Sequence, residues 1–170
     1  MSQEKSKSNS FSPNGCGCLV LLILLTPVIV LVLPSFLLCH ANKPKQSEGK
    51  QYISSMNKGQ QAYYAENTAF SNSVPALGLG IKTETTNYKY SISATKTAAF
   101  SYAVAKNKTL ENYVGGVFLV PADPNDPKNA MRSLSTILCQ ADSPGTMKPA
   151  EPTYQNGKLI CGKGTTEVTK

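Results

Sequence analysis

The sequence predicts an α+β protein: a membrane-spanning helix, then an amphipathic helix packed on a small antiparallel sheet, and a disulfide-closed loop near the C-terminus. Three observations lead to this prediction. Residues 18–39 form an uncharged apolar run, residues 47–67 carry apolar side chains at a helical period, and several later segments alternate apolar with polar residues. The predicted divisions are a disordered tail (1–17), the membrane helix (18–39), the amphipathic helix (40–67), and the sheet with its C-terminal loop (68–170).

The apolar run reads CLVLLILLTPVIVLVLPSFLLC and is interrupted mainly by Pro27 and Pro34. As a helix with a rise of about 1.5 Å per residue it would extend about 33 Å, enough to cross a hydrocarbon core of about 30 Å. A cleaved signal peptide or a buried soluble helix are the alternatives. A signal peptide has a shorter apolar region that ends in small residues, whereas this run ends in Phe-Leu-Leu-Cys. The sequence therefore predicts a retained, single-pass anchor in contact with membrane lipid.

The orientation of the anchor is predicted from two opposing signals. Residues 1–17 are rich in Ser, Lys and Asn and are expected to be a disordered tail. Counting lysines alone would place the C-terminal side in the cytoplasm, because two precede the run and four closely follow it: Lys5 and Lys7, then Lys43, Lys45, Lys50 and Lys58. That rule weakens for long translocated domains, and the cysteines favour the opposite orientation. We expect a cytoplasmic tail and a periplasmic or extracellular domain, anchored in the inner (plasma) membrane.

The cysteines fall into two groups. Cys16, Cys18 and Cys39 flank the apolar run, while Cys139 and Cys161 are the two in the domain that follows it. A disulfide between Cys139 and Cys161 is the simplest interpretation, and it indicates an oxidising compartment. The Cys16-x-Cys18 spacing does not fit zinc pairs or a redox C-x-x-C motif.

No catalytic or metal-binding constellation is found in the sequence. His40 is the single histidine and stands alone after the apolar run. There is no Gly-x-Ser-x-Gly motif, and Asp123 and Asp126 lie in a proline-rich segment where they are expected to be solvated. The sequence thus predicts a protein that is not an enzyme and has no cofactor or metal.

The net charge of +7, from 17 basic and 10 acidic residues, comes mostly from scattered lysines. This pattern favours a solvated basic surface. The alternative is weak, salt-sensitive attraction to nucleic acid or an anionic polysaccharide, for which no arginine-rich patch is present.

The predicted amphipathic helix runs from Ser47 to Asn67, with Ser47 as N-cap and Glu48 in the first turn. Pro44 is expected to break or bend any helix before it. One stripe at a period of about 3.6 residues carries its larger side chains: Tyr52, Ile53, Met56, Gln60, Tyr63 and Tyr64. Core packing of the two adjacent tyrosines is favoured over a ligand-stacking platform.

For the rest of the chain, the sequence predicts a loop and then three or four antiparallel strands. Residues 70–82 are rich in Gly and Pro and are predicted to be a loop. Strands are expected at 87–95, 100–106 and 110–120, with a further candidate at 133–139. A short final segment at 158–161 is also expected to be extended, with a hairpin turn at 96–99 and a loop at 123–128 between strands.

Several segments resemble the type IV pilin and pseudopilin family, above all the cyanobacterial pilin-like proteins of the G/H type. The similar segments are LPSFL (33–37), ANKPKQSEGKQY (41–52), SMNKGQQAYYAEN (55–67), LGLGI (77–81), TETTNY (83–88) and NYVGGVF (112–118). The resemblance covers roughly residues 31–165. It implies a membrane-anchored long helix on an antiparallel sheet, and assembly with other pilins or pilus and secretion components through the anchor helix.

The N-terminal region departs from that family. The resemblance implies cleavage by a prepilin peptidase after a glycine followed by Phe-Thr-Leu-Ile-Glu, yet here the region reads Gly15-Cys16-Gly17-Cys18, with neither the phenylalanine nor the glutamate. That acid normally pairs with a neighbouring subunit in the membrane, where an unpartnered charge is costly. The hypothesis is therefore a minor or non-polymerising pilin with a degenerate processing site. A membrane-tethered binding module for DNA, polysaccharide or a secreted partner is the alternative.

Overall fold

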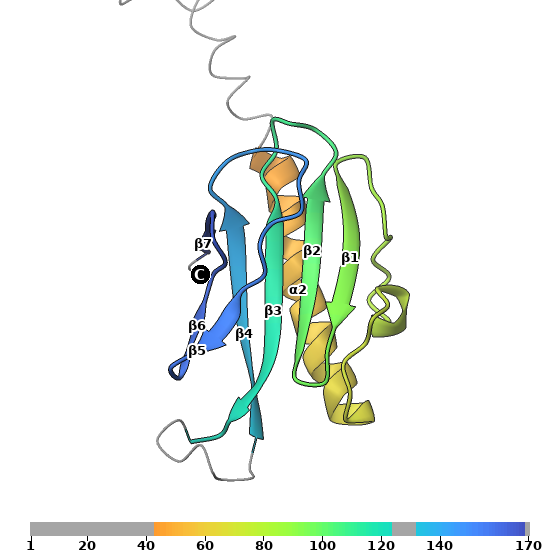
Figure 1. Cartoon of the computed structure of the whole chain (residues 1–170). Coiled ribbons are helices and arrows are strands. Elements are labelled where there is room, and N and C mark those ends of the chain that lie inside the picture. Colours follow the sequence, from red (N-terminus) through yellow and green to blue (C-terminus); the bar gives the residue numbers. More distant parts are fainter. Residues whose placement is uncertain (1–42, 124–131, 169–170) are drawn as a thin grey trace, which may run out of the picture. The chain divides into compact units, whose positions relative to one another are not determined.

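The computed structural model of the chain describes residues 43–123 and 132–168. One helix, α2 (Lys43–Asn67), packs on an antiparallel sheet, which confirms the predicted α+β class (Figure 1). Among the described residues no helix is both long and apolar enough to span a membrane. The predicted tail, the apolar run 18–39, the processing residues Gly15, Cys16, Gly17 and Cys18, and Asp126 all lie outside the described residues.

The main sheet has five strands in the order β1-β2-β3-β4-β7, and every neighbouring pair is antiparallel. Its strands are β1 (Tyr88–Ala94), β2 (Ala98–Ala105), β3 (Tyr113–Pro121), β4 (Arg132–Ala141) and β7 (Thr165–Glu167). A separate two-stranded sheet joins β5 (Thr153–Gln155) to β6 (Lys158–Ile160). The first four strands therefore follow one another as a meander, and the chain returns through β5 and β6 before β7 completes the sheet.

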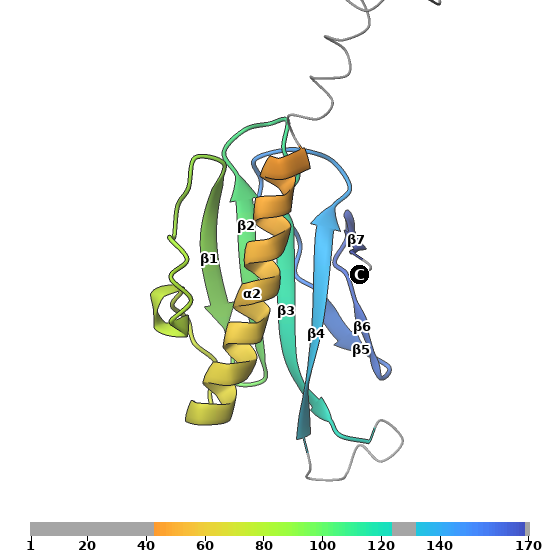
Figure 2. The same cartoon turned by 180° about the vertical axis from the view of Figure 1, so that it is seen from behind.

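The two faces of the main sheet are covered by different parts of the chain. Helix α2 lies over β2 and β3 on one face, while the β5–β6 hairpin lies on the opposite side (Figure 2). On the helix face, Ile53 and Met56 pack with Tyr88 and Tyr113. On the other face, Tyr154 and other residues of the C-terminal segment pack against a cluster built from β2, β3 and β4. The central strands β2 and β3 are accordingly buried on both sides.

The described helix runs from Lys43, the first described residue, and so includes positions before the predicted start at Ser47. Pro44 belongs to this helix, and the prediction that it breaks or bends a helix before it concerns residues outside the described ones. Ile53, Met56 and Gln60 are buried as the predicted stripe requires. Tyr63 and Tyr64 are half-buried, and the Tyr64 ring packs 4.7 Å from that of Phe70, which supports packing for Tyr64.

Four predicted strands correspond to β1, β2, β3 and β4, while the C-terminal part of the chain differs from expectation. The hairpin turn between β1 and β2 is shorter than predicted, because β2 already begins at Ala98. The predicted loop 70–82 contains the short 3-10 helix η1 (Pro75–Leu77). The predicted final strand is β6, and its partner β5 and the fifth strand β7 were not predicted.

Candidate functional site

Helix and sheet approach each other most closely where Asn57 crosses Gly115. A Cβ atom on Gly115 would lie 2.3 Å from Asn57 Oδ1 and 2.6 Å from Ile53 Cγ2, so only glycine fits beneath the helix. Asn57 Nδ2 donates a hydrogen bond of 3.0 Å to the carbonyl oxygen of Ile137 in β4. The helix is thereby tied to the sheet at its middle.

A carboxylate fixes the N-terminal half of the helix to the start of β1. Glu48 accepts hydrogen bonds from Thr85 Oγ1 at 2.6 Å, Asn87 Nδ2 at 2.7 Å and the Tyr90 hydroxyl at 3.1 Å. Burial alone would raise the pKa of Glu48, but the three donors together hold that pKa below its usual value. From the sequence, Glu48 was expected only to interact favourably with the helix dipole in the first turn. In the structure it forms this tertiary contact with the loop before β1 and with Tyr90.

A second carboxyl group lies at the same end of the sheet in a different environment. Glu111 accepts a hydrogen bond from Gln140 Nε2, and burial raises the pKa of Glu111. The Tyr88 hydroxyl donates to the backbone carbonyl of Glu111 at 3.1 Å, and burial raises the pKa of Tyr88 above its usual range. Within 43–123 and 132–168, no group of three or more His, Cys, Asp or Glu side chains could hold a metal ion.

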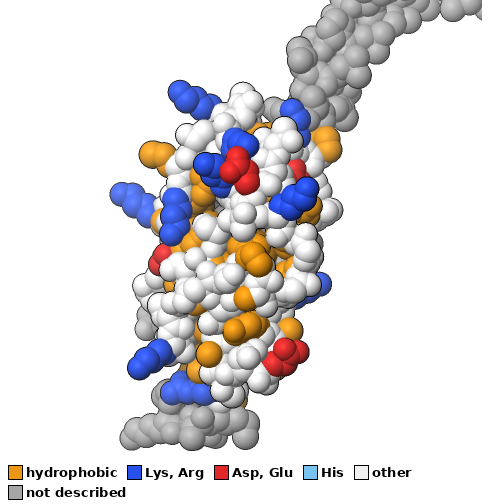
Figure 3. Space-filling view, turned by 90° about the vertical axis from the view of Figure 1, so that its right-hand side faces the viewer, with side chains coloured by type: hydrophobic (Ala, Val, Ile, Leu, Met, Phe, Trp, Pro, Cys, Tyr) orange, Lys and Arg blue, Asp and Glu red, His pale blue; other side chains and the backbone are white. Residues whose placement is uncertain are grey.

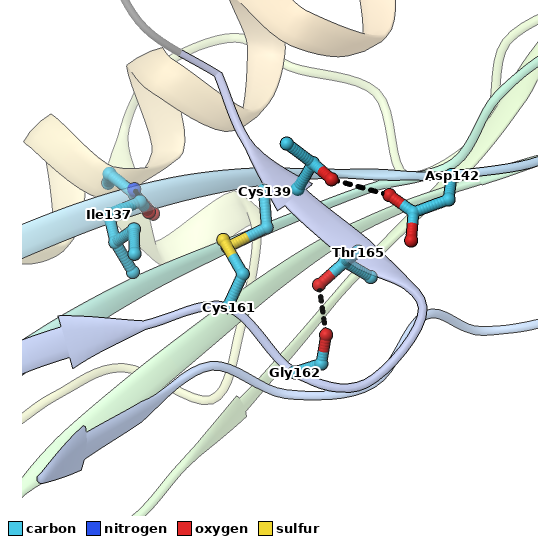
Figure 4. The surroundings of a disulfide bond; sticks show 8 residues. Ile137, Cys139, Asp142, Cys161, Gly162 and Thr165 are labelled. Atoms are coloured by element: carbon cyan, nitrogen blue, oxygen red, sulfur yellow. Dashed lines mark hydrogen bonds between the residues drawn. A yellow bond between two sulfur atoms is a disulfide. The ribbon is translucent and has the colours of Figure 1, made fainter.

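The predicted disulfide between Cys139 and Cys161 is present and joins β4 to the segment after β6 (Figure 4). Cys139 is fully buried, on the sheet face opposite the helix. Beside the disulfide the chain turns, and Thr165 Oγ1 donates to the carbonyl oxygen of Gly162 at 2.7 Å. The bond therefore holds the C-terminal segment where β7 can pair with β4.

The segment before β5 crosses the sheet face opposite the helix, and two of its side chains contact Tyr102. The Tyr102 hydroxyl donates a hydrogen bond to Glu151 Oε1, and Lys148 Nζ lies 3.7 Å from the centre of the Tyr102 ring. Pro152 is fully buried and lies against Gly116, where a Cβ atom would be 2.8 Å from Pro152 Cγ. These contacts and the disulfide fix the C-terminal loop region on the sheet, as the sequence predicted in outline.

Beside the helix, the sheet is not fully covered, and a groove of about 520 Å³ runs between α2 and β4. Lys50, Ser54, Lys58 and Gln61 line its helix side, Thr136 and Leu138 line its sheet side, and Glu167 and Val168 also contribute to the lining. The groove arises because α2 crosses β2 and β3 and reaches β4 mainly near Asn57. This groove was not predicted from the sequence. The spacing of Lys50 and Lys58, about two helical turns, was the available signal.

The remaining lysines do not form a patch on the face that carries β1. In Figure 3 the basic side chains of that face stand apart from one another, with few acidic ones between them. Lys106 forms an ion pair of 2.6 Å with Glu84. This arrangement agrees with the solvated basic surface expected from the sequence.

Comparisons with known proteins give one result. Residues 46–162 match the family described as type IV pilin-like G and H. No curated protein and no solved structure matches the chain. The match spans α2, η1 and strands β1 to β6, and thus nearly all of the described helix and sheet. The chain therefore belongs to the type IV pilin-like G and H family.

Proposed function

We propose that this protein is a membrane-anchored, minor or non-polymerising subunit associated with type IV pili or a related secretion filament. The family match over residues 46–162 is the observation that carries the proposal. The anchor is the apolar run 18–39, and the part it holds outside the cytoplasm is the helix-and-sheet domain that begins at Lys43.

Two features support a location outside the cytoplasm. The Cys139–Cys161 disulfide is a bond that persists in oxidising compartments and is rare in reducing ones. The apolar run is long enough to serve as a single-pass anchor. In this arrangement the N-terminal tail is cytoplasmic and the domain is periplasmic or extracellular.

The minor, non-polymerising role is proposed from the N-terminal sequence. Between Cys16 and Cys39 there is no acidic residue to pair with a neighbouring subunit, and Gly15 and Gly17 lack the phenylalanine that follows the cleavage glycine in the resembled family. The partners proposed are other pilins or assembly proteins, contacted through the anchor.

Mass spectrometry of the protein purified from membranes tests the processing proposal. The expected result is an N-terminus at or near Met1, without methylation at an internal residue. A methylated N-terminus at Cys16 or Cys18 would show that a prepilin peptidase processes the chain and would refute the uncleaved form.

Co-purification separates the two function classes. A filament-associated subunit is recovered with sheared pili or with the assembly proteins, and this recovery is lost when those components are deleted. If the protein instead stays in the membrane unchanged and its domain binds DNA or polysaccharide in a salt-dependent manner, the tethered binding module replaces the filament role.

A further inference from the structure

Among residues 43–123 and 132–168, no strand pairs with the outer side of the N-terminal half of β4, which we call the open edge. Strand β7 pairs only with Cys139–Ala141, and the Val168 N–H donates to the Leu138 carbonyl at 2.9 Å. Along an antiparallel strand, the backbone N–H and C=O groups of every second residue point to the same side. Those of Leu138 point outward, away from β3, and those of Thr136, Leu134 and Arg132 therefore point outward as well. No residue in the described ranges hydrogen-bonds to the outward groups of these three.

The opposite edge of the sheet is covered by the chain itself. The Tyr90 N–H donates to the Thr83 carbonyl at 2.8 Å, and the Thr85 N–H donates to the Tyr88 carbonyl at 2.9 Å. Asn72 Oδ1 accepts from the Ala94 N–H at 2.7 Å. Unpaired edge groups are a template for another strand, so the two edges of this sheet differ in their capacity to bind one.

The α2–β4 groove lies beside this open edge, on the helix face of the sheet. Thr136 and Leu138 face the groove, because Leu138 is the register partner of Gly115, which lies under the helix. Lys50 and Lys58 line the groove from the helix, and neither forms an ion pair with a described residue. Glu167 is the acidic residue of the described lining, so the two lysines leave the groove with a net positive charge that favours a bound segment of opposite charge.

We propose that the open edge of β4 binds an extended, acidic segment of a partner protein. The segment adds as a strand beside Arg132–Thr136 and directs carboxylates into the α2–β4 groove, which adjoins this edge at Thr136 and is lined by Lys50 and Lys58. A peptide backbone supplies both the donors and the acceptors that the edge requires. A phosphate backbone supplies acceptors only and would leave the outward carbonyl groups of β4 unpaired. This interaction does not depend on whether the protein enters a filament.

A short fluorescent peptide of alternating glutamate and valine is the probe, used with the full chain in detergent at physiological ionic strength. Fluorescence anisotropy is expected to show saturable binding. A matched lysine–valine peptide should bind at least about tenfold more weakly, because the groove is basic. A third peptide has the acidic sequence but carries N-methyl groups on the alternate backbone nitrogens that would face β4. It should also bind at least about tenfold more weakly, because it lacks the N–H donors for backbone hydrogen bonds to the strand.

Two charge-reversal variants provide the matched comparison. Lys50→Glu with Lys58→Glu should weaken binding of the acidic peptide about tenfold. Lys96→Glu with Lys108→Glu changes the net charge by the same amount at exposed sites away from the groove lining, and should change the affinity less than about twofold. Amide hydrogen exchange should show slower exchange at Leu134 and Thr136 when the acidic peptide is bound.

Each other outcome overturns the proposal. Absence of peptide binding does so directly. Equal weakening by the two charge-reversal pairs, or binding without protection of Leu134 and Thr136, would show general attraction of a basic surface for anions. Protection of these amides without peptide, increasing with protein concentration, would show that a second copy of this chain occupies the edge.

Discussion

Gly115 is the residue that sets the distance between helix and sheet. It lies in β3 beneath Asn57 and Ile53, and any side chain there must displace the helix. We predict that Gly115→Ala lowers the free energy of unfolding by about 1–3 kcal/mol, the usual cost of overpacking a close contact. Chemical denaturation measures the change.

The matched control for this substitution is Gly145→Ala. No atom lies within 4 Å of the position of a Cβ at Gly145, so this variant should change the free energy of unfolding by less than about 0.5 kcal/mol. An equally stable Gly115→Ala protein would show that the helix can move away from the sheet without loss.

The environment of Glu48 leads to a prediction of how the free energy of unfolding depends on pH. Its pKa is lowered in the folded protein, so it stabilises the fold above its unfolded pKa, and this contribution is lost as the pH falls through the folded value. We predict that Glu48→Gln lowers the free energy of unfolding near pH 7 by about 2 kcal/mol, because a charged acceptor of three hydrogen bonds is removed. The variant should also lose less stability than the natural protein between about pH 5 and pH 3.

Glu111 is the control for Glu48, because its pKa is shifted in the opposite direction. Burial raises its pKa, so it stabilises the folded protein fully below its unfolded pKa, and this contribution is lost as the pH rises through the folded value. Glu111→Gln should therefore leave the stability near pH 7 unchanged or higher. If both variants gave the same pH dependence of unfolding, the assigned environments of the two carboxyl groups would be wrong.

At the scale of elements, the disulfide determines how firmly the C-terminal segment is attached. It links Cys139 to Cys161 across 22 positions of the sequence. We predict that replacing both cysteines by alanine lowers the free energy of unfolding by about 3 kcal/mol, following the loop-closure entropy of a cross-link of this size. The local consequence should be faster amide exchange in β6 and β7, measured by mass spectrometry.

The exchange of α2 and β1 serves as the internal reference for that variant. Both elements contribute to the hydrophobic cluster on the helix face, away from the disulfide, and should keep their protection at low denaturant. Uniform loss of protection would mean that the C-terminal segment and the rest of the sheet unfold as one unit.

The sequence predicted the elements well where local periodicity decides the structure. Tyr88 and Tyr90 alternate with polar residues in β1, and the Leu119–Val120 end of an apolar run marks β3. Strand β7 has the sequence Thr-Thr-Glu, which carries no apolar alternation, and it forms because the disulfide and the ladder to β4 hold it there. Such a strand depends on tertiary contacts and has no local signal.

The contacts of the helix illustrate a different limit of prediction from the sequence. The decisive partners of Glu48 are Thr85, Asn87 and Tyr90, about forty positions away in the sequence. Only the folded arrangement of helix and loop brings them together, so the sequence could not assign them.

At the scale of the whole molecule, the groove and the open edge are left because helix α2 lies mainly over β2 and β3 rather than over β4. The helix and β4 were both expected, whereas the lateral position of the helix over β2 and β3 was not. That position depends on small residues such as Gly115 that admit the helix only at certain places on the sheet. The lysines of α2 therefore looked scattered in the sequence, although Lys50 and Lys58 line one groove in the structure.

The chain divides into two units, Met1–His40 and Ala41–Lys170, and the described residues lie in the second. We predict that residues 41–170 fold without the first unit, because the described hydrophobic clusters and the disulfide lie within them. Under oxidising conditions this fragment should unfold cooperatively in denaturant, with a midpoint close to that of the domain in the full chain. Non-cooperative unfolding of the oxidised fragment would show that the domain needs its N-terminal segment to fold. The same fragment should be absent from membranes and filament preparations, because the proposed anchor has been removed.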